Sequence, residues 1–400
     1  MTAVDGKSKA QLARQRRQRR NRIITLAALL VLVAAWLYGY FSQGQDVQPL
    51  VPDVLPAADQ VEPRGEIFLA YDQAGELIGF AGVGQGSGYG GPVEMLVGLD
   101  TEGQITGVKV VENRETPGFF RRLPAEDFFR QFLGVSARDD LRLGQDLDAA
   151  SGATVSSEAV AAAVRAEARS LARSQLDMQI PADSEPIKFG PPEIVLLALF
   201  AAGYAGHRSR NPDIKKWVRR ITLLTGALVL GFIYNKPLTL ANFISLLSGY
   251  WPDWHSNIYW FLLLGGLLLV TSAQGKNPYC SWFCPFGAVQ EGLSNLTGAK
   301  LFRPRRFHHL LTWIQRGLAF AAIVLGLAFR QPGAASFEPF GTLFNQTGST
   351  AQWILLLLVL IGSLVMYRPF CAYLCPVDPV VDYIGEVRGW MRGTWRKLRA

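Results

Sequence analysis

The four cysteines of this 400-residue chain form two matched pairs, and their sulfur atoms carry the clearest chemistry in the sequence. Each pair has the spacing Cys-x-x-x-Cys-Pro and follows a long apolar stretch. Thiolates bind soft metals and iron–sulfur clusters, so two pairs brought together would supply four ligands for one centre. The pairs are Cys280 with Cys284 and Cys371 with Cys375, in the echoing segments 278–285 and 369–376.

Other roles for the four thiols stay open on spacing alone. Four thiolates also suit structural zinc. Two pairs could cycle as redox disulfides, and a free cysteine packs well as a small buried residue. The repeat favours a single cluster, because both motifs have the same direction relative to the apolar stretches. Two halves related by an axis along the membrane normal would bring the pairs face to face.

A proline follows the second cysteine of each pair. Proline disfavours the α conformation in the residue before it and is itself favoured at the first helical position. We therefore expect Cys284 and Cys375 to cap helices over about 285–297 and 376–390. A helix N-terminus favours anions, including a thiolate-ligated cluster, and Arg303, Arg305, Arg306 and Arg368 could balance the charge.

Apolar stretches and loop charge predict a protein that crosses a membrane several times. A span needs about 20 apolar residues, with a range of about 17–25. Lysine and arginine gather in alternate loops, as the positive-inside rule expects. Both termini and both cysteine motifs would then be cytoplasmic, where structural disulfides are rare. The six predicted spans are 23–41, 193–206, 218–234, 258–272, 310–329 and 353–366.

The first span follows a basic tail, residues 1–22, and could be a signal peptide or an uncleaved anchor. The sequence Tyr-Phe-Ser-Gln at 40–43 lacks the small-x-small pattern of a cleavage site, so we expect an anchor at 23–41. The net charge is +8, but the basic residues lie beside apolar segments. This placement predicts contact with the lipid bilayer and no nucleic-acid partner.

The segment after this anchor, residues 60–178, has the pattern of an α+β domain and would lie outside the cytoplasm. Glycines crowd residues 82–91 and are typical of a loop with positive φ angles. Four short apolar runs predict two hairpins, the first with Gly75 in its turn. The runs are 66–71, 77–80, 93–99 and 105–111.

A stretch rich in serine, glycine and alanine, residues 148–157, precedes an alanine-rich helix that extends to about residue 176. Ser156 or Ser157 is a natural N-cap for this helix. Thr154 would then present its hydroxyl just ahead of a helix N-terminus, where free N–H groups and the dipole favour a phosphate. An ordinary turn before a helix is the alternative that the spacing leaves open.

The pattern Asp-x-x-Ser-Gly-Ala-Thr-x-Ser-Ser at 148–157 resembles the flavinylation motif of FMN-binding domains in Rnf and Nqr subunits and in NosR-type proteins. The resemblance implies FMN joined through its phosphate to Thr154, attached by a flavin transferase outside the cytoplasm. Residues 88–93 and 115–118 resemble two further motifs of these domains, whereas Phe119 and Phe120 depart from the small residues common there. The implied flavin-site residues are Asp148, Ser151, Gly152, Ala153, Thr154, Tyr89, Gly90, Glu115, Thr116, Pro117 and Gly118.

The repeated Cys-x-x-x-Cys-Pro motif after an apolar helix resembles the membrane module shared by NosR-, NapH- and CcoG-type proteins. An FMN domain followed by this module is the order found in NosR/NirI proteins. The resemblance implies one cluster on all four cysteines, with 4Fe–4S favoured over 2Fe–2S. Those proteins usually carry a further ferredoxin-like domain, and no cysteine follows Cys375 here, so a separate electron donor is expected.

Together these patterns predict an α-helical membrane bundle of about six transmembrane helices with an α+β extracytoplasmic FMN-binding domain. The membrane module would cover 190–390, with a basic cytoplasmic tail at 391–400. The expected location is the bacterial inner membrane. The expected function is electron transfer between the cluster and FMN, with protein redox partners on one or both sides and no catalytic side chain of its own.

Two other functions stay open. One is a redox-sensing regulator or maturation factor of the NosR/NirI type, in which the cluster reports a state or assists assembly. The other is a component of an Rnf/Nqr-like ion-translocating complex. A proton path would need buried carboxylates, and the predicted spans contain almost none.

Distance constrains the predicted electron transfer. The bilayer core is about 30 Å thick, and tunnelling decays steeply, so an outer flavin and an inner cluster need a closer approach. Two outer apolar segments, about 238–249 and 337–344, are too short to cross. They could be interfacial helices within an aromatic belt, or they could be re-entrant and dip inward against the bundle.

Overall fold

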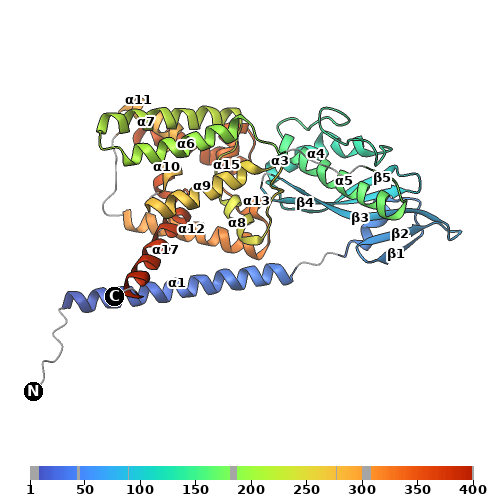
Figure 1. The fold of residues 1–400 in the computed structure, drawn as a ribbon, viewed down its shortest axis with the longest axis horizontal. Coiled ribbons are helices and arrows are strands. Elements are labelled where there is room, and N and C mark those ends of the chain that lie inside the picture. The colour runs from blue at the N-terminus through green and yellow to red at the C-terminus, as the bar shows by residue number, and fades with distance from the viewer. Residues whose placement is uncertain are drawn as a thin grey trace, which may run out of the picture.

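The computed structural model describes residues 9–42, 46–88, 90–180, 187–275, 277–299 and 308–398. It has two parts that lie side by side, a sheet covered by a helix and a bundle of helices (Figure 1). Helix α1 (Lys9–Phe41) runs along one side of the bundle and packs against α12 (His308–Ala328).

The sheet is a five-stranded antiparallel meander in the order β1-β2-β3-β4-β5. The predicted hairpins are confirmed, and Gly75 occupies its turn with a φ of 81°. Helix α5 (Thr154–Gln175) packs on β3 and β4 and closes the larger apolar core, while the short helix α2 (Val51–Val54) packs on β4 and β5. The strands are β1 (Gln60–Arg64), β2 (Ile67–Tyr71), β3 (Leu77–Ser87), β4 (Pro92–Asp100) and β5 (Ile105–Asn113).

The glycines expected in a loop at 82–91 lie in part inside strand β3, so that interpretation was wrong. Three of them alternate along the strand beneath α5. A Cβ on Gly86 would lie 1.8 Å from the carbonyl oxygen of Ala159, and one on Gly84 would lie 2.2 Å from that of Ala163. The absence of side chains there lets the helix backbone rest directly on the strand.

Helix α5 begins at Thr154 with Ala153 in the N-cap position, so the predicted serine cap is also wrong. The two serine hydroxyls have other partners. Ser156 donates to the carboxylate of Glu115 (3.0 Å), and Ser157 accepts from the backbone N–H of Ala150 (3.0 Å). These contacts tie the first turn of α5 to neighbouring loops and leave Thr154 exposed as the first helical residue.

The bundle repeats one arrangement twice, as the echo in the sequence predicts. In each half a helix leads to a short outer segment, an apolar helix, a short cysteine-bearing helix and a longer helix that starts after the second cysteine. After α6 (Pro191–Arg208), the first half contains α7 (Pro212–Thr225) with its π-helical extension η3 (Gly226–Ile233), α8 (Leu240–Ser248), α9 (Ile258–Gln274), α10 (Pro278–Trp282) and α11 (Pro285–Thr297). The second half contains α12, α13 (Pro332–Ala335), α14 (Phe340–Asn345), α15 (Thr350–Val365), α16 (Pro369–Tyr373) and α17 (Val377–Leu398).

Two segments are long and apolar enough to cross a membrane, Ile23–Phe41 and His308–Ala328. A third candidate is the pair Ile258–Ala273 and Pro278–Thr297, which bends by 96° between its helices. Thr350–Val365 is apolar but shorter. The predicted count of six spans is therefore not confirmed in the part of the chain that the structure describes. The apolar helices nevertheless indicate a membrane protein.

Both outer segments are buried against the bundle. Most side chains of α8 are buried, and on α14 Phe340 and Phe344 are 3% and 8% exposed. Phe340 packs against Phe286 (ring centroids 4.9 Å apart) in the helix that follows the first cysteine motif. Both segments also contact the sheet part, so their depth relative to a membrane stays a prediction.

We predict that Gly86→Ala destabilises the sheet part by about 1–3 kcal/mol, because the added methyl must displace the backbone of α5. Gly82→Ala is the matched control: its Cβ would meet only the carboxylate end of Glu167, which can rotate away. Thermal unfolding of the purified full-length variants checks the difference. Equal melting temperatures for the two variants would contradict the close contact between Gly86 and α5.

Candidate cofactor sites

The three segments that resemble flavin motifs meet at the buried carboxylate of Glu115, which is 1% exposed. One carboxylate oxygen accepts the backbone N–H groups of Gly90 (2.5 Å) and Thr116 (2.8 Å). The other accepts the hydroxyl of Ser156 (3.0 Å). Residues far apart in the sequence are thus brought together as the resemblance expects. Tyr89, also predicted at this site, lies outside the described residues.

The loop before Thr154 is held by side chains from other segments, which contact its backbone. Gly152 adopts a positive φ of 68° within this loop. The contacts are Gln131 with the N–H and carbonyl of Asp148 (2.7 and 3.1 Å), Glu126 with the N–H of Ser151 (2.8 Å), Arg122 with the carbonyl of Ser151 (2.9 Å) and Asn345 with the carbonyl of Gly152 (3.1 Å). The loop is therefore fixed while the Thr154 hydroxyl stays accessible.

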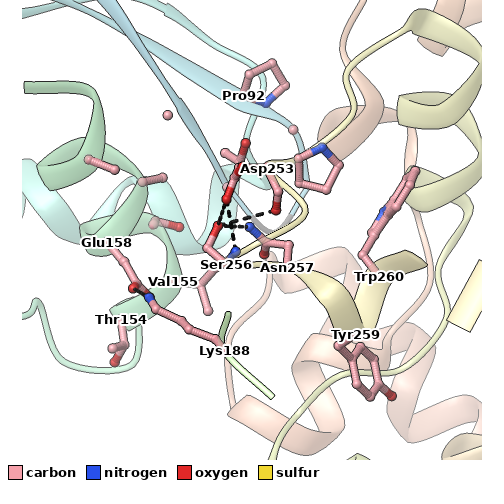
Figure 2. A pocket seen from close by; sticks show the side chains of 18 of the residues that line it. Pro92, Thr154, Val155, Glu158, Lys188, Asp253, Ser256, Asn257, Tyr259 and Trp260 are labelled. Carbon is pink, nitrogen blue, oxygen red and sulfur yellow. Dashed lines mark hydrogen bonds and ion pairs between the residues drawn. The ribbon is translucent and has the colours of Figure 1, made fainter. Parts of the chain in front are cut away.

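Thr154 lies on the wall of a large cavity between the sheet part and the bundle, with a volume of about 1700 Å³. Figure 2 shows Thr154 and Val155 on one side and Tyr259 and Trp260 on the other. Small-molecule sites usually measure about 300–1,000 Å³, so this cavity has room for a flavin and more. Basic side chains suited to a phosphate share the lining: Arg114, Arg142, Arg165, Lys188, Lys236 and Arg330.

Not every predicted flavin residue lines this cavity. Gly152 and Ala153 do, as does Phe119 from the departing Phe-Phe pair. Pro117 and Gly118 are absent from its lining, and a Cβ on Gly118 would lie 3.2 Å from the Thr347 side chain of the bundle. The loop at 115–118 therefore joins the sheet part to the bundle and lies beside the cavity.

A stack of charged and aromatic groups anchors the sheet part to the bundle. The ring of Tyr250 has the guanidinium of Arg114 at 4.8 Å and that of Arg330 at 4.5 Å from its centroid. Arg114 is 2% exposed and pairs with Glu94 (2.6 Å) and Glu112. Burial raises the pKa of Glu112 even though Arg114 opposes the shift. No sequence pattern pointed to this stack, because its members come from three distant segments.

The two cysteine motifs fold alike. In each, a short helix starts at a proline and carries the first cysteine, and the second cysteine stands just before the next helix. The N–H of Cys284 donates to the carbonyl of Tyr279 (2.9 Å), and that of Cys375 donates to the carbonyl of Phe370 (2.8 Å). The predicted helices at 285–297 and 376–390 are thus confirmed, although the second continues to Leu398.

Side chains from each half of the bundle reach the cysteine motif of the other half. Gln290 donates to the sulfur of Cys371 (3.2 Å) and accepts the N–H of Phe370 (3.0 Å). In the opposite direction, Arg368 donates to the carbonyl of Cys280 (3.1 Å). Cys280 and Cys371 line one cavity of about 470 Å³, while Cys284 and Cys375 are buried. The pairs are therefore neighbours, as an axis along the membrane normal requires.

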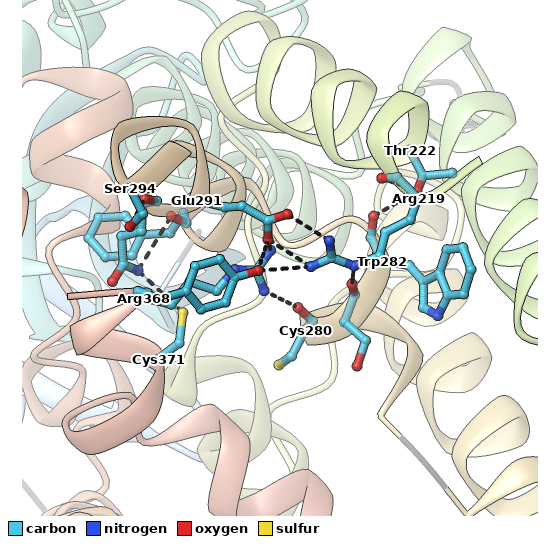
Figure 3. Close-up of polar contacts among 12 residues, drawn as sticks. Arg219, Thr222, Cys280, Trp282, Glu291, Ser294, Arg368 and Cys371 are labelled. Atoms are coloured by element: carbon cyan, nitrogen blue, oxygen red, sulfur yellow. Dashed lines mark hydrogen bonds and ion pairs between the residues drawn. The ribbon is translucent and has the colours of Figure 1, made fainter. Parts of the chain in front are cut away.

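A charged network lies beside this cavity. The carboxylate of Glu291 accepts two hydrogen bonds from Arg219 (2.6 and 2.7 Å) and one from the Tyr367 hydroxyl (2.5 Å). It also pairs with Arg368 (2.5 Å), so it stands between two guanidinium groups (Figure 3). These two cations and one anion stand near the thiols, and the carboxylate of Asp378 lines the same cavity. The sequence indicated Arg368 as a charge-balancing residue but gave no signal for Arg219. The other arginines predicted for that role lie outside the described residues: Arg303, Arg305 and Arg306.

The donor set and its surroundings fit an iron–sulfur cluster. Among the described residues, no group of three or more His, Cys, Asp or Glu side chains converges on a single-ion site. Cys280 and Cys371 line the same cavity, so one group placed there could reach a sulfur of each pair. Burial raises the pKa of the Cys371 thiol to about 12, so a thiolate there needs a compensating positive centre.

Comparison with known protein families identifies two domains in the chain. The family of FMN-binding domains matches residues 88–168, and the family of 4Fe-4S binding domains matches residues 256–305 and 352–397. The chain therefore contains an FMN-binding domain and a 4Fe-4S domain. The second match includes all four cysteines and the first includes Thr154.

The chain is homologous to NirI and NosR. It is 30% identical to Protein NirI of Paracoccus denitrificans over 200 residues, which is 46% of this chain and 29% of NirI. It is 28% identical to Regulatory protein NosR of Pseudomonas aeruginosa over 211 residues, or 48% of this chain and 28% of NosR. The match thus spans less than a third of either relative.

Two further similarities cover shorter stretches of the chain. One component of the ion-translocating oxidoreductase complex of Escherichia coli is 37% identical over 87 residues, which is 20% of this chain and 42% of that protein. Among solved structures, Shewanella oneidensis NqrC matches 30% of this chain and 70% of its own at 22% identity, with a TM-score of 0.22.

We predict that Glu115→Ala destabilises the flavin domain by about 1–3 kcal/mol for each buried donor that loses its acceptor. It should also lower the FMN content of the purified protein. Glu115→Gln should largely preserve both, because the amide oxygen can accept the two N–H groups while its NH₂ donates to Ser156. Thermal unfolding and flavin absorbance measure the effects. Equal losses in the two variants would contradict this role for the hydrogen bonds.

Proposed function

We propose that this protein transfers electrons across a bacterial cytoplasmic membrane. The carriers are an iron–sulfur cluster on Cys280, Cys284, Cys371 and Cys375 and an FMN joined covalently to Thr154. One observation carries the proposal: a single chain combines an accessible threonine on a cavity wall with four neighbouring cysteines in the adjoining bundle. The matches to an FMN-binding and a 4Fe-4S domain support electron transfer.

The residues around Thr154 suit a phosphate held by a covalent bond. Thr154 is the first residue of α5, so unpaired N–H groups of the first turn lie beside its hydroxyl. Lys188 and Arg142 line the same cavity and would balance phosphate charge. When bound, FMN supplies a centre that exchanges one or two electrons. A phosphoester would retain this centre outside the cell, where a free cofactor would be lost by diffusion.

The residues around the cysteines would hold a 4Fe–4S cluster and control its surroundings. Four thiolates are the usual ligand set. Gln290 donates to the sulfur of Cys371, and hydrogen bonds to sulfur are one means of setting a cluster potential. Arg219 and Arg368, with Glu291 between them, would offset the negative charge of the ligated cluster.

The proposed topology has six crossings, with both termini and the cysteines in the cytoplasm and the FMN domain outside. The distribution of basic residues supports this orientation. Helices that are short for a span still expose large apolar side chains on the bundle surface, as lipid contact requires. Examples are Leu197 of α6, Phe232 of η3, Leu269 of α9 and Leu358 of α15.

Partner proteins follow from this proposal. A flavin transferase would attach FMN, a separate donor would reduce the cluster, and an acceptor outside would oxidise the flavin. A second candidate function, a redox-sensing regulator, is favoured by the similarity to a protein named Regulatory protein NosR. A place in an ion-translocating complex, as for the Escherichia coli relative, ranks third because the spans hold almost no carboxylate.

The test is a pair of cofactor-specific variants of the full-length protein, purified without oxygen. Thr154→Ala should abolish flavin that survives denaturation, seen as in-gel fluorescence, and leave iron and sulfide content unchanged. Cys371→Ser should remove most of the iron and keep the flavin. Zinc in place of iron, or flavin retained in Thr154→Ala, would refute the proposal.

The same variants separate the two leading functions. In an electron-transfer protein, Thr154→Ala should abolish reduction of the outer partner. In a sensor that uses only the cluster, regulation should persist without flavin. A cell-based reporter of the regulated genes, read beside partner reduction, distinguishes these outcomes.

A further inference from the structure

The second outer segment, defined here as residues 332–347, touches all three flavin motifs. In the motif at 88–93, a Cβ on Gly91 would lie 3.0 Å from the side chain of Pro332. A Cβ on Gly333 of the segment would lie 2.6 Å from the carbonyl carbon of Glu115. Asn345 donates to the carbonyl of Gly152 (3.1 Å), which lies two residues before Thr154. The ring of Phe119, on the wall of the flavin cavity, would lie 3.3 Å from a Cβ on Gly341.

The same segment also touches the residues that flank the cysteines. The ring of Phe340 lies 4.9 Å from that of Phe286 and 6.0 Å from that of Phe370, and those two lie 5.2 Å apart. Phe286 follows Cys284 by two positions, and Phe370 directly precedes Cys371. All three rings are at most 3% exposed.

The first outer segment makes an equivalent contact. The N–H of Leu238, just before α8, donates to the hydroxyl of Tyr279 (2.8 Å). Tyr279 precedes Cys280 just as Phe370 precedes Cys371. Both outer segments therefore reach the residue before the first cysteine of a motif. The second segment extends this contact to the flavin cavity by way of Phe119.

We infer that Phe340, Phe286 and Phe370, defined here as the phenylalanine bridge, form the route by which electrons pass between the cluster and the flavin. The inference rests on the proposed function and adds the route to it. In the step, one electron leaves the reduced iron–sulfur cluster, which is oxidised, and arrives on the flavin, which is reduced. No bond forms or breaks. The rings are not themselves oxidised; they supply a dry, densely packed medium through which the electron tunnels.

Continuity of packing is the physical argument for this route. Phe119, on the cavity wall, lies against Gly341, and Phe340 is the chain neighbour of Gly341. The ring of Phe340 packs on that of Phe370, and Cys371 is the next residue in the chain. Each link is a covalent bond or a close contact, and Phe119, Phe340 and Phe370 are buried. This packed path spans the protein between the flavin cavity and the second cysteine motif.

The helix that carries Phe340 also provides a matched control. Phe344 lies one turn away on α14 and is 8% exposed, but its ring packs on Phe232 of η3 (5.0 Å) and on Gly231. A change at Phe344 therefore removes the same atoms from the same short helix without altering the path to the cysteines.

The experiment compares Phe340→Leu with Phe344→Leu in the full-length protein, loaded with both cofactors and kept without oxygen. A photochemical reductant fills the cluster rapidly, and flavin absorbance reports the arrival of the electron. Phe340→Leu should slow this transfer severalfold, while iron content, flavin content and both midpoint potentials stay unchanged. Phe344→Leu should match the wild-type rate, and Phe340→Tyr should largely restore it.

A transfer rate that is insensitive to Phe340→Leu, or equal slowing in Phe344→Leu, would overturn the route. If Phe340→Leu fails to load its cofactors, Phe286→Leu replaces it in the same comparison. Absence of iron or of covalent flavin in the wild-type protein would instead refute the proposed function. The two failures are thus distinguishable.

A second measurement tests the contact without any flavin. In a Thr154→Ala background, the pair Gly118→Cys and Thr347→Cys should form a disulfide, because a Cβ on Gly118 lies 3.2 Å from the Thr347 side chain. Peptide mapping should find this bond in the double variant and not in Gly118→Cys alone. A double variant that stays reduced outside the cytoplasm would show that the flavin loop does not rest on the outer segment, and the route would fall.

Discussion

Broken helices inside an apolar bundle create the constraint on which the rest of this structure depends. Each cysteine motif ends one short helix and begins another, so backbone N–H and C=O groups lose their helical partners at these breaks. Each such group costs several kcal/mol in hydrocarbon if it finds no partner. Buried polar side chains meet this need. Gln315 donates to the carbonyl of Cys375 (2.8 Å), and Thr222 donates to that of Trp282 (2.8 Å).

The hydrogen bonds that satisfy these backbone groups also position the sulfur atoms of the cysteines. Gln315 and Thr222 belong to the same half as the carbonyl groups they satisfy, whereas Gln290 and Arg368 reach the cysteine motif of the opposite half. Each motif is therefore fixed relative to the other and not only within its own half. Glu338 does the same for the outer segments, because its buried carboxylate accepts the N–H of Leu240 at the start of α8 (2.6 Å). The polar residues in these apolar helices are a structural consequence of the breaks.

Local chemistry made part of this arrangement predictable from the sequence. Proline after each second cysteine fixed where α11 and α17 begin, and alternation fixed the hairpins, because these features depend on neighbours in the chain. The meeting of the three flavin motifs followed from resemblance to a family, not from spacing.

The features that the sequence did not predict depend on tertiary contacts between distant segments and not on neighbours in the chain. The glycines of β3 resemble a loop until α5 is placed on them, and Ser156 resembles a cap until Glu115 is placed beside it. Gln290, Gln315 and Tyr250 carry no sequence signal at all, because their partners lie in other segments. The count of spans is obscured for a related reason, because helices that end at the outer segments and at the cysteine breaks are shorter than an ordinary span.

The two halves are similar in backbone but differ in how their outer segments are used, and this difference links the bundle to the flavin domain. Near the first outer segment, the Tyr250 ring receives Arg114 and Arg330, which anchors the sheet part by charge and aromatic contact. The second presents glycines at 333 and 341, so that the loops at 115–119 can approach its backbone. The Tyr250 stack and the backbone contacts at Gly333 and Gly341 together fix how the sheet part sits on the bundle. They therefore also fix the cavity whose wall includes Thr154. The chain thereby positions both candidate cofactor sites on the same rigid contacts that satisfy its broken helices.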